Sequence, residues 1–235
     1  MITGTDLAIL DFIRAHMTSP LGDEIMPIIT MLGDNGIIWI VMAAVMLLFK
    51  RTRKLGAAMA IALVIDVICC NFMIKPLVAR IRPFDVNTAI KLIISAPDDY
   101  SFPSGHTAAA FAAFGALFFG RKKLTGSANS FIGMNIYDDL SKHNGSIAPV
   151  GVQALNYEEF SSDRASVFSQ KNLWIPVLVI AILIAASRLY LYVHYPTDVL
   201  AGMMLGILFG FIGANITAYL WKARILRNSK RISIR

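Results

Sequence analysis

The sequence predicts an all-α membrane protein, a polytopic bundle of five to six transmembrane helices. Of the 235 residues, 56% are hydrophobic and only 16% are charged, and the mean hydropathy is +0.61. An average soluble domain is less apolar and more highly charged than this. Helices are expected because a helix pairs its own backbone N–H and C=O groups, which lipid leaves without partners.

Five apolar segments are the candidate spans. A helix needs about 20 residues to cross the hydrocarbon core, so the first and third segments need flanking residues to complete a span. In chain order the segments run from Gly36 to Phe49, Leu55 to Ile74, Gly105 to Phe119, Leu173 to Tyr190 and Thr197 to Trp221.

Residues 1–35 allow two interpretations. Apolar residues recur at helical spacing from Leu7 to Met31, which favours an interfacial helix followed by a second short helix. A tilted or broken first span is the alternative, because polar residues and a proline interrupt the pattern. These are Asp11, Arg14, Pro20, Asp23 and Glu24. The first twenty residues lack the basic start and unbroken apolar core of a signal peptide, so no cleavage is expected.

Residues 124–172 differ in composition from the rest of the chain. They are rich in Ser, Asn and Gly, and their five acidic and three basic residues give a net charge of −2 in a chain whose net charge is +7. We expect residues 1–123 and 173–235 to form one membrane domain, and 124–172 to form a polar cytoplasmic insertion. A regulatory insertion, a linker without fixed structure and an engineered insert all stay open.

Basic residues predict the orientation of the spans. If the spans alternate, 13 of the 22 Lys and Arg residues fall on one side, which the positive-inside rule makes cytoplasmic. They are Lys50, Arg51, Arg53 and Lys54 after the first segment, Arg121, Lys122 and Lys123 after the third, and Lys222, Arg224, Arg227, Lys230, Arg231 and Arg235 in the tail. Topology and anionic lipid headgroups thus account for the positive charge, and no nucleic-acid partner is expected.

Three polar clusters fall at the opposite, outward ends of the spans. The first contains Lys75, Arg80 and Arg82, followed by Pro83. Anchoring at the membrane interface is one explanation, but cations kept on the side that is poor in Lys and Arg favour an anionic partner. Arg can bind phosphate through two parallel hydrogen bonds, and Lys supplies a point charge.

The second cluster, Pro103-Ser104-Gly105-His106, is typical of a helix start. Ser can cap the helix, and Gly lets an anion approach the free N–H groups at the positive end of the helix dipole. His106 can donate a proton to a departing oxygen.

The third cluster contains Ser187-Arg188, His194 and Asp198. Pro196 disfavours a continuous helix between His194 and Asp198, and a turn there would bring the carboxylate to one nitrogen of the imidazole ring. The other nitrogen would then face phosphorus as a nucleophile. The alternative is that Asp198 only caps the last span, and one residue can do both.

Together the three clusters resemble the complete tripartite signature of a known family. Six residues separate Lys75 from Arg82-Pro83, Pro103-Ser104-Gly105-His106 follows, and five and then three residues separate Ser187-Arg188, His194 and Asp198. This order and spacing is similar to that of the type 2 phosphatidic acid phosphatases, in the lipid phosphate phosphatase and vanadium haloperoxidase superfamily. The resemblance covers roughly Gly36 to Trp221, apart from the polar segment.

The resemblance implies a role for each residue. His194 attacks phosphorus and forms a phosphohistidine, Asp198 orients His194, and His106 protonates the leaving oxygen and then activates water. The residues that hold the phosphoryl oxygens are Lys75, Arg82, Ser104, Gly105 and Arg188. Apart from the resemblance, Arg80 is an additional cation that would suit a diphosphate, or equally an anchor to lipid headgroups. No metal or other cofactor is expected, because the cations and backbone N–H groups neutralise the charge that Mg²⁺ would otherwise meet.

The resemblance also implies the substrate class, a phosphorylated membrane lipid. The short chain and the run from Tyr192 to Gly202 are most similar to bacterial undecaprenyl-diphosphate phosphatases, and phosphatidylglycerophosphate and phosphatidic acid are the competing substrates. Relatives that bind vanadate and oxidise halides are typically soluble, unlike this apolar chain. The alternative of a different class is a lipid-binding scaffold without catalysis, and the sequence does not identify protein partners.

A carboxylate within a span needs its own explanation. Asp66 lies nine residues before Lys75, roughly 13 Å away at helical rise, which is too deep in the membrane for the phosphate chemistry. Such a group is costly unless it has a partner. We expect Asn71 or a polar backbone group to be that partner.

Overall fold

The protein is a bundle of helices, seen here in a computed structural model that describes residues 2–124 and 172–232. Within these residues every regular element is helical, which confirms the predicted fold class. The elements are α1 (Ile2–His16), α2 (Pro20–Met31), η1 (Asp34–Gly36), α3 (Ile37–Leu48), α4 (Arg53–Asp66), η2 (Val67–Ile74), α5 (Lys75–Val78), α6 (Pro83–Val86), α7 (Gly105–Lys123), α11 (Trp174–Tyr190) and α12 (Pro196–Ile232).

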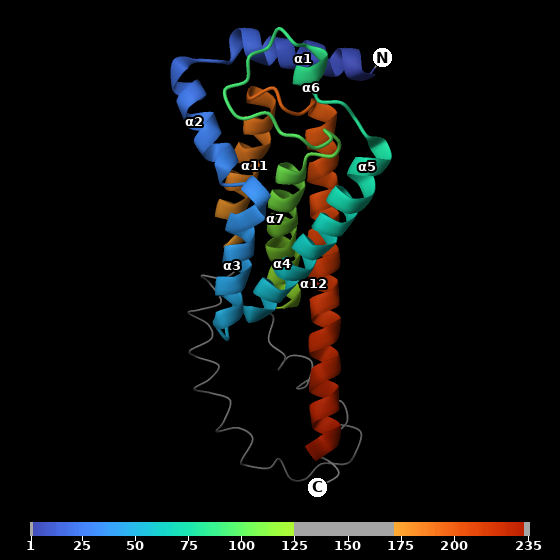
Figure 1. The fold of residues 1–235 in the computed structure, drawn as a ribbon. Helices are drawn as coiled ribbons and strands as arrows, with labels where there is room; N and C mark the ends of the chain where they lie inside the picture. The colour runs from blue at the N-terminus through green and yellow to red at the C-terminus, as the bar shows by residue number, and fades with distance from the viewer. Residues whose placement is uncertain (1, 125–171, 233–235) are drawn as a thin grey trace.

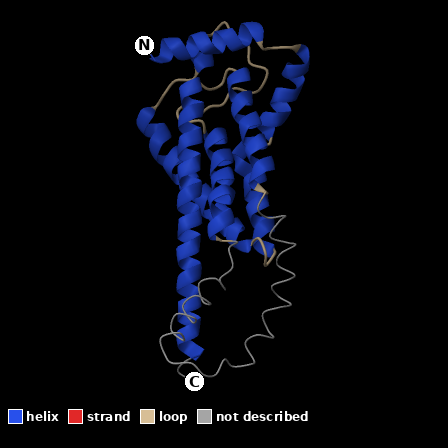
Figure 2. Ribbon diagram, turned by 180° about the vertical axis from the view of Figure 1, so that it is seen from behind, coloured by secondary structure: helices blue, strands red, loops and turns tan. Residues whose placement is uncertain are grey.

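Helix α7 is the centre of the bundle. It packs against α12, α4, α11 and α3, and α1 lies across one end of these helices (Figure 1). The same arrangement is visible from behind, where α12 extends beyond the other helices at the opposite end (Figure 2). We call the end covered by α1 the α1 end of the bundle.

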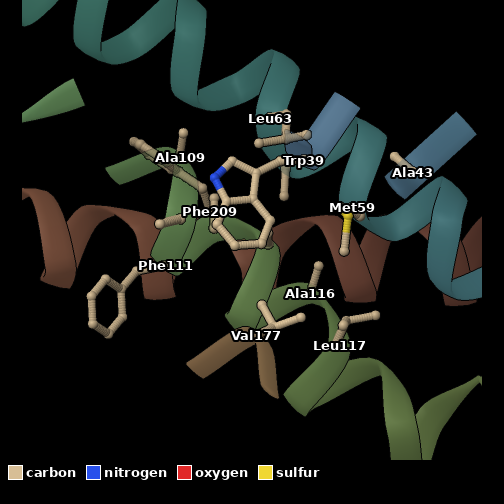
Figure 3. Packing of buried hydrophobic residues seen from close by; sticks show 14 of the residues in the cluster. Trp39, Ala43, Met59, Leu63, Ala109, Phe111, Ala116, Leu117, Val177 and Phe209 are labelled. Carbon is tan, nitrogen blue, oxygen red and sulfur yellow. The ribbon is translucent and has the colours of Figure 1, made fainter. Parts of the chain in front are cut away.

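Small residues allow the central helix to be surrounded closely. Six of its alanines are buried, namely Ala108, Ala109, Ala110, Ala112, Ala113 and Ala116. Trp39 of α3 fills the space beside them and is only 1% exposed; its indole lies near Leu63 of α4 and Phe209 of α12 (Figure 3). In lipid, burial of apolar surface between helices gives little gain in free energy. Close packing of this kind is therefore what holds the helices together.

Three glycines of α12 bring its backbone against that of α7. A Cβ atom built on Gly202 would fall 2.6 Å from the carbonyl oxygen of Ser104. One built on Gly206 would fall 2.3 Å from the carbonyl oxygen of Ala108, and one built on Gly210 would fall 2.5 Å from the backbone nitrogen of Ala116. Their spacing of four residues places them on one face of the helix. The pattern is the small-residue seam that lets membrane helices approach closely.

We expect Gly206→Ala to lower the free energy of unfolding by about 3 kcal/mol, the upper end of overpacking costs, because α7 and α12 must separate to admit the methyl group. Gly4→Ala on α1 is the matched control, since a Cβ there meets nothing within 4 Å and Ala favours the helix by about 1 kcal/mol. Unfolding of the detergent-purified variants measures both effects. Equal stability of the two variants would contradict the proposed helix seam.

Residues 1–35 combine both interpretations, because α1 is a separate helix followed by the second short helix α2, and α2 is also the first half of a broken span. Helices α2 and α3 belong to one apolar stretch, Pro20–Leu48, that is long enough to cross a membrane. The break is at η1, where Asn35 and Gly36 have φ of 51° and 65°. Asn and Gly tolerate this left-handed conformation, which ends one helix before the next begins. Residues 20–35 thus complete the short segment Gly36–Phe49, while α1 lies across the bundle.

The other predicted spans are also helical. By length and composition, Arg53–Val86 and Pro196–Arg224 can cross a membrane, and Trp174–Tyr190 is a shorter apolar helix. The protein is therefore an integral membrane protein. The predicted insertion at residues 124–172 lies, apart from its two end residues, outside the part of the chain that the structure describes.

Candidate active site

All three polar clusters contribute to one cavity at the α1 end of the bundle. The cavity has a volume of about 490 Å³. Six of the predicted site residues line it: Lys75, Arg82, Gly105, His106, Arg188 and His194. The remainder of its wall includes the apolar side chains of Pro27, Met31, Ile93 and Ile94, and the carboxylates of Asp34 and Asp99. The arrangement combines cations and two imidazoles with an apolar wall.

A π-helix, whose turns are wider than those of an α-helix, immediately precedes Lys75. Residues Val67–Ile74 form this π-helix, and Pro76 follows one residue after it. Proline cannot donate a backbone hydrogen bond, and its ring crowds the carbonyl four residues earlier, so the wider turn relieves that contact. Ala79 then turns the chain with a φ of 46°. Lys75 is thereby held, largely buried, at the cavity.

Asp99 connects the two cations of the first cluster. Its carboxylate forms ion pairs with Lys75 Nζ and with Arg82 Nη2, and its carbonyl accepts a hydrogen bond of 2.7 Å from Arg82 Nε. Partial burial opposes ionisation of this carboxyl, but the hydrogen bond and charge of Lys75 and the charge of Arg82 outweigh it and lower its pKa to about 2. Asp99 is therefore ionised and already forms ion pairs with both cations, Lys75 and Arg82.

His194 lies in the loop between α11 and α12 and is 1% exposed. Its Nε2 is 3.3 Å from Arg82 Nη1, and the same guanidinium nitrogen donates to the carbonyl of Val193 at 2.7 Å, which fixes the loop. Burial, followed by the charges of Arg188, Arg82 and Lys75, lowers the pKa of His194 well below its usual value. The neutral imidazole keeps a lone pair for attack.

Asp198 faces the other nitrogen of the same ring. Its Oδ2 lies 3.6 Å from His194 Nδ1 and accepts hydrogen bonds from the backbone N–H of Tyr195 at 3.0 Å and the hydroxyl of Ser101 at 2.5 Å. The bond to Tyr195 caps the start of α12. Both interpretations of Asp198 therefore fit the geometry, because one carboxylate caps the helix and approaches His194.

Arg80 contacts residues outside the cavity. Its guanidinium pairs with Asp198, bonds Asp6 Oδ2 of α1 at 2.7 Å and Thr197 Oγ1 at 2.7 Å, and lies over the ring of Tyr195. Arg80 is not among the residues that line the cavity. It connects α1 to the carboxylate behind the nucleophile.

The start of α7 brings the second cluster to the cavity. The hydroxyl of Ser104 is buried and bonds Thr107 Oγ1 at 2.9 Å, rather than capping the helix. A Cβ on Gly105 would lie 3.6 Å from Lys75 Nζ, so the helix start and this cation are adjacent. His106 Nε2 lies 2.8 Å from Asp34 Oδ1. Arg188 of the third cluster is buried and donates to Thr30 Oγ1 at 2.5 Å.

Asp34 and Asp99 were not among the predicted site residues. A signal for Asp34 exists, since the triplet Asp34-Asn35-Gly36 is a turn pattern inside an apolar stretch. Asp99 has no comparable signal, because it lies in an irregular loop.

Asp66 is buried at 4% exposure, and its Oδ1 has no hydrogen-bond partner among the described residues. The expected hydrogen bond from Asn71 to this oxygen is therefore not formed. Among the described residues, no three His, Cys, Asp or Glu side chains are grouped so as to hold a metal ion.

The chain is similar in sequence and fold to known membrane phosphatases. Undecaprenyl-diphosphatase of Sulfolobus acidocaldarius is 28% identical over 179 residues, which are 76% of this chain and 63% of the archaeal protein. The chain thus spans less than two thirds of that relative's length. A PAP2-type phosphatidylglycerolphosphate phosphatase from Bacillus subtilis has a similar structure, with a TM-score of 0.58 and 25% identity over 92% of this chain and 85% of that one.

A second solved structure, LpxE of Aquifex aeolicus, shares the fold with a TM-score of 0.51 and 20% identity, covering 89% of this chain and 94% of that one. The family model described as the PAP2 superfamily matches residues 51–222, which contain all three polar clusters. This chain therefore belongs to the PAP2 superfamily.

Proposed function

We propose that the protein is a phosphatase that removes phosphate from a membrane lipid through a phosphohistidine at His194. The observation that carries this proposal is that His194 and His106 line one cavity together with Lys75, Arg82 and Arg188. A nucleophile, a proton donor and cations for phosphoryl oxygens are the parts that phosphoryl transfer needs. A scaffold that only binds lipid would not need the two imidazoles.

In the first step His194 Nε2 attacks phosphorus while the bond from phosphorus to the leaving oxygen breaks. His106 donates a proton to that oxygen, which leaves as an alcohol or as a phosphate. Asp198 Oδ2 lies 3.6 Å from His194 Nδ1, and a small approach in the substrate complex would let it accept a hydrogen bond from Nδ1–H and so keep the attacking nitrogen unprotonated. Lys75, Arg82 and Arg188 face the oxygens that gain charge, assisted by backbone N–H groups at Gly105. The mechanism uses no metal.

In the second step His106 takes a proton from water as the water oxygen attacks phosphorus. The bond between phosphorus and Nε2 breaks, inorganic phosphate leaves, and both imidazoles return to their starting protonation states. His106 therefore serves as acid and then as base, as microscopic reversibility allows.

The lipid that fits best is undecaprenyl diphosphate, which is the substrate named for the Sulfolobus relative. The apolar wall formed by Pro27, Met31, Ile93 and Ile94 suits an acyl or prenyl chain beside the phosphate. Phosphatidylglycerophosphate is the second candidate, favoured by the similarity to the Bacillus structure. Phosphatidic acid is the third. Arg80 gives no support for a diphosphate, because Asp6 and Asp198 already engage it.

The positive-inside rule favours an extracytoplasmic active site. The basic residues around 50–54, 121–123 and the end of α12 lie at the end of the bundle opposite to α1 (Figure 1). We therefore propose that this opposite end, together with residues 124–172 and the C-terminal tail, is cytoplasmic.

Phosphate release from purified protein tests the function. We expect turnover without added metal, and in the presence of a chelator, on a panel of undecaprenyl diphosphate, phosphatidylglycerophosphate and phosphatidic acid. The highest kcat/KM is expected for undecaprenyl diphosphate. Protein that binds these lipids in vesicles and releases no phosphate would favour the scaffold and contradict the enzyme.

A further inference from the structure

The cavity holds a second pair of histidine and carboxylate, contributed by two distant parts of the chain. His106 Nε2 is 2.8 Å from Asp34 Oδ1, and Asp34 lies before the residues 51–222 that the family model matches. We infer that Asp34 is a positioning residue that orients His106 and favours its protonated form when the leaving oxygen takes a proton. This inference rests on the proposed function, in which His106 is the acid.

The break in the first span places Asp34 at the cavity. Asp34 is the first residue of η1, and η1 packs against α7. Had α2 continued as a regular helix into α3, the chain would not turn beside the start of α7. The left-handed residues Asn35 and Gly36 therefore hold a carboxylate opposite an imidazole 72 residues away.

Gly33, which precedes Asp34, packs against the imidazole ring of His106. A Cβ atom on Gly33 would lie 2.8 Å from His106 Cδ2, which is shorter than a van der Waals contact between carbons. The backbone at Gly33 and the carboxylate of Asp34 thus lie along the same edge of the ring, at Cδ2 and Nε2. Gly33 has a φ of −90°, so its lack of a side chain serves the contact rather than the backbone conformation.

The charges around His106 explain why a carboxylate is needed. Lys75, Arg82 and Arg188 line the same cavity and disfavour another positive charge, whereas a carboxylate at hydrogen-bond distance favours the imidazolium. A general acid must carry its proton before it can donate it. Asp34 supplies the single negative charge in direct contact with this imidazole among the described residues.

The hydrogen bond also selects the working nitrogen. With Nε2–H donating to Asp34, Nδ1 is the nitrogen that exchanges a proton with the leaving oxygen and then with water. The pair thus resembles His194 and Asp198. In His194 the carboxylate faces Nδ1 and Nε2 reacts, whereas in His106 the carboxylate faces Nε2 and Nδ1 exchanges the proton.

The test compares substrates whose leaving groups differ in their need for a proton. An alkyl phosphate leaves poorly without protonation, whereas the aryl phosphate p-nitrophenyl phosphate leaves readily. We expect Asp34→Asn to lower kcat for an alkyl lipid phosphate about 10- to 100-fold, the size of loss seen when the carboxylate that orients a metal-bound histidine is removed. For p-nitrophenyl phosphate we expect a loss of less than about threefold, and KM should change little for both.

The pH dependence of kcat distinguishes an effect of the Asp34 charge on His106 from a purely structural role of Asp34. Without the carboxylate the imidazolium loses its proton at lower pH, so the alkaline limb of kcat should shift to lower pH in Asp34→Asn. Gly33→Ala, which pushes the ring without changing charge, should give the same dependence on the leaving group with no such shift. This second variant keeps the inference testable if Asp34→Asn is unstable.

Controls separate the inference from the function on which it rests. Asp23→Asn changes a carboxylate of α2 that accepts a hydrogen bond from Tyr190 and lies outside the cavity lining, and it should leave kcat unchanged. His106→Ala should show the same dependence on the leaving group, and adding Asp34→Asn to it should cost nothing further.

The outcomes distinguish two failures. If the unmodified protein releases no phosphate from any substrate, the proposed function fails and the inference falls with it. If His106→Ala is impaired as expected but Asp34→Asn and Gly33→Ala both behave like Asp23→Asn, the function stands and the inference about Asp34 is overturned.

Discussion

His194→Ala is expected to abolish turnover, with a loss in kcat of at least about 10⁴-fold, because removal of a covalent nucleophile removes the reaction path itself. The ring is buried at the cavity with Nε2 beside Arg82, and the described cavity wall offers no second imidazole except His106. Protein labelled with ³²P from the substrate should carry acid-labile, base-stable phosphate in the unmodified chain and none in the variant.

The control for this result is His16→Ala. His16 is exposed on α1, where its Nδ1 bonds the carbonyl of Phe12, so its loss should leave both the rate and the label unchanged. Binding of a lipid phosphate to vesicle-reconstituted His194→Ala should persist, because the cations are intact. A labelled, active His194→Ala protein would refute the assignment of the nucleophile.

Asp198→Asn is expected to lower kcat by roughly 10⁴-fold with little change in KM, as seen when an orienting carboxylate in a catalytic triad becomes an amide. Asp198 Oδ2 lies 3.6 Å from His194 Nδ1. An amide group presented there can donate to Nδ1 and so favour the tautomer whose proton sits on the attacking nitrogen. The effect should therefore appear in formation of the phosphohistidine.

A second variant separates orientation from charge balance. Asp198 and Asp6 both pair with Arg80, so either amide substitution weakens the same buried network. Asp6→Asn leaves the contact to His194 in place, and we expect it to lower thermal stability while keeping kcat within about threefold, because a partly buried pair contributes mainly to stability. Similar losses of kcat in the two variants would assign Asp198 to the network rather than to the nucleophile.

The sequence predicts the parts of this site that depend on spacing along the chain. The apolar segments predicted the helices, and the alternation of spans brought Lys75, His106, Arg188 and His194 to one end. Pro196 correctly indicated a turn before Asp198, since the last helix begins at that proline. These features are local or follow from the topology, so one chain is enough to find them.

Contacts between side chains far apart in the sequence could not be predicted in the same way. Arg80 stands beside Lys75 and Arg82 in the sequence, yet it turns toward Asp6 on α1, because a φ of 46° at Ala79 redirects the chain. Asp34 reaches His106 only because the first span is broken. No periodicity in the loop before the second cluster indicates that Asp99 returns to Lys75.

The position of Asp99 changes what substrate affinity means for the proposed phosphatase. If Lys75 and Arg82 take phosphoryl oxygens as proposed, the Asp99 carboxylate must release both, so binding is an exchange of one anion for another. The measured dissociation constant then reports a difference between two affinities, and the charge around the cations stays nearly constant through each turnover. Such an exchange releases few counterions, so KM should depend only weakly on ionic strength.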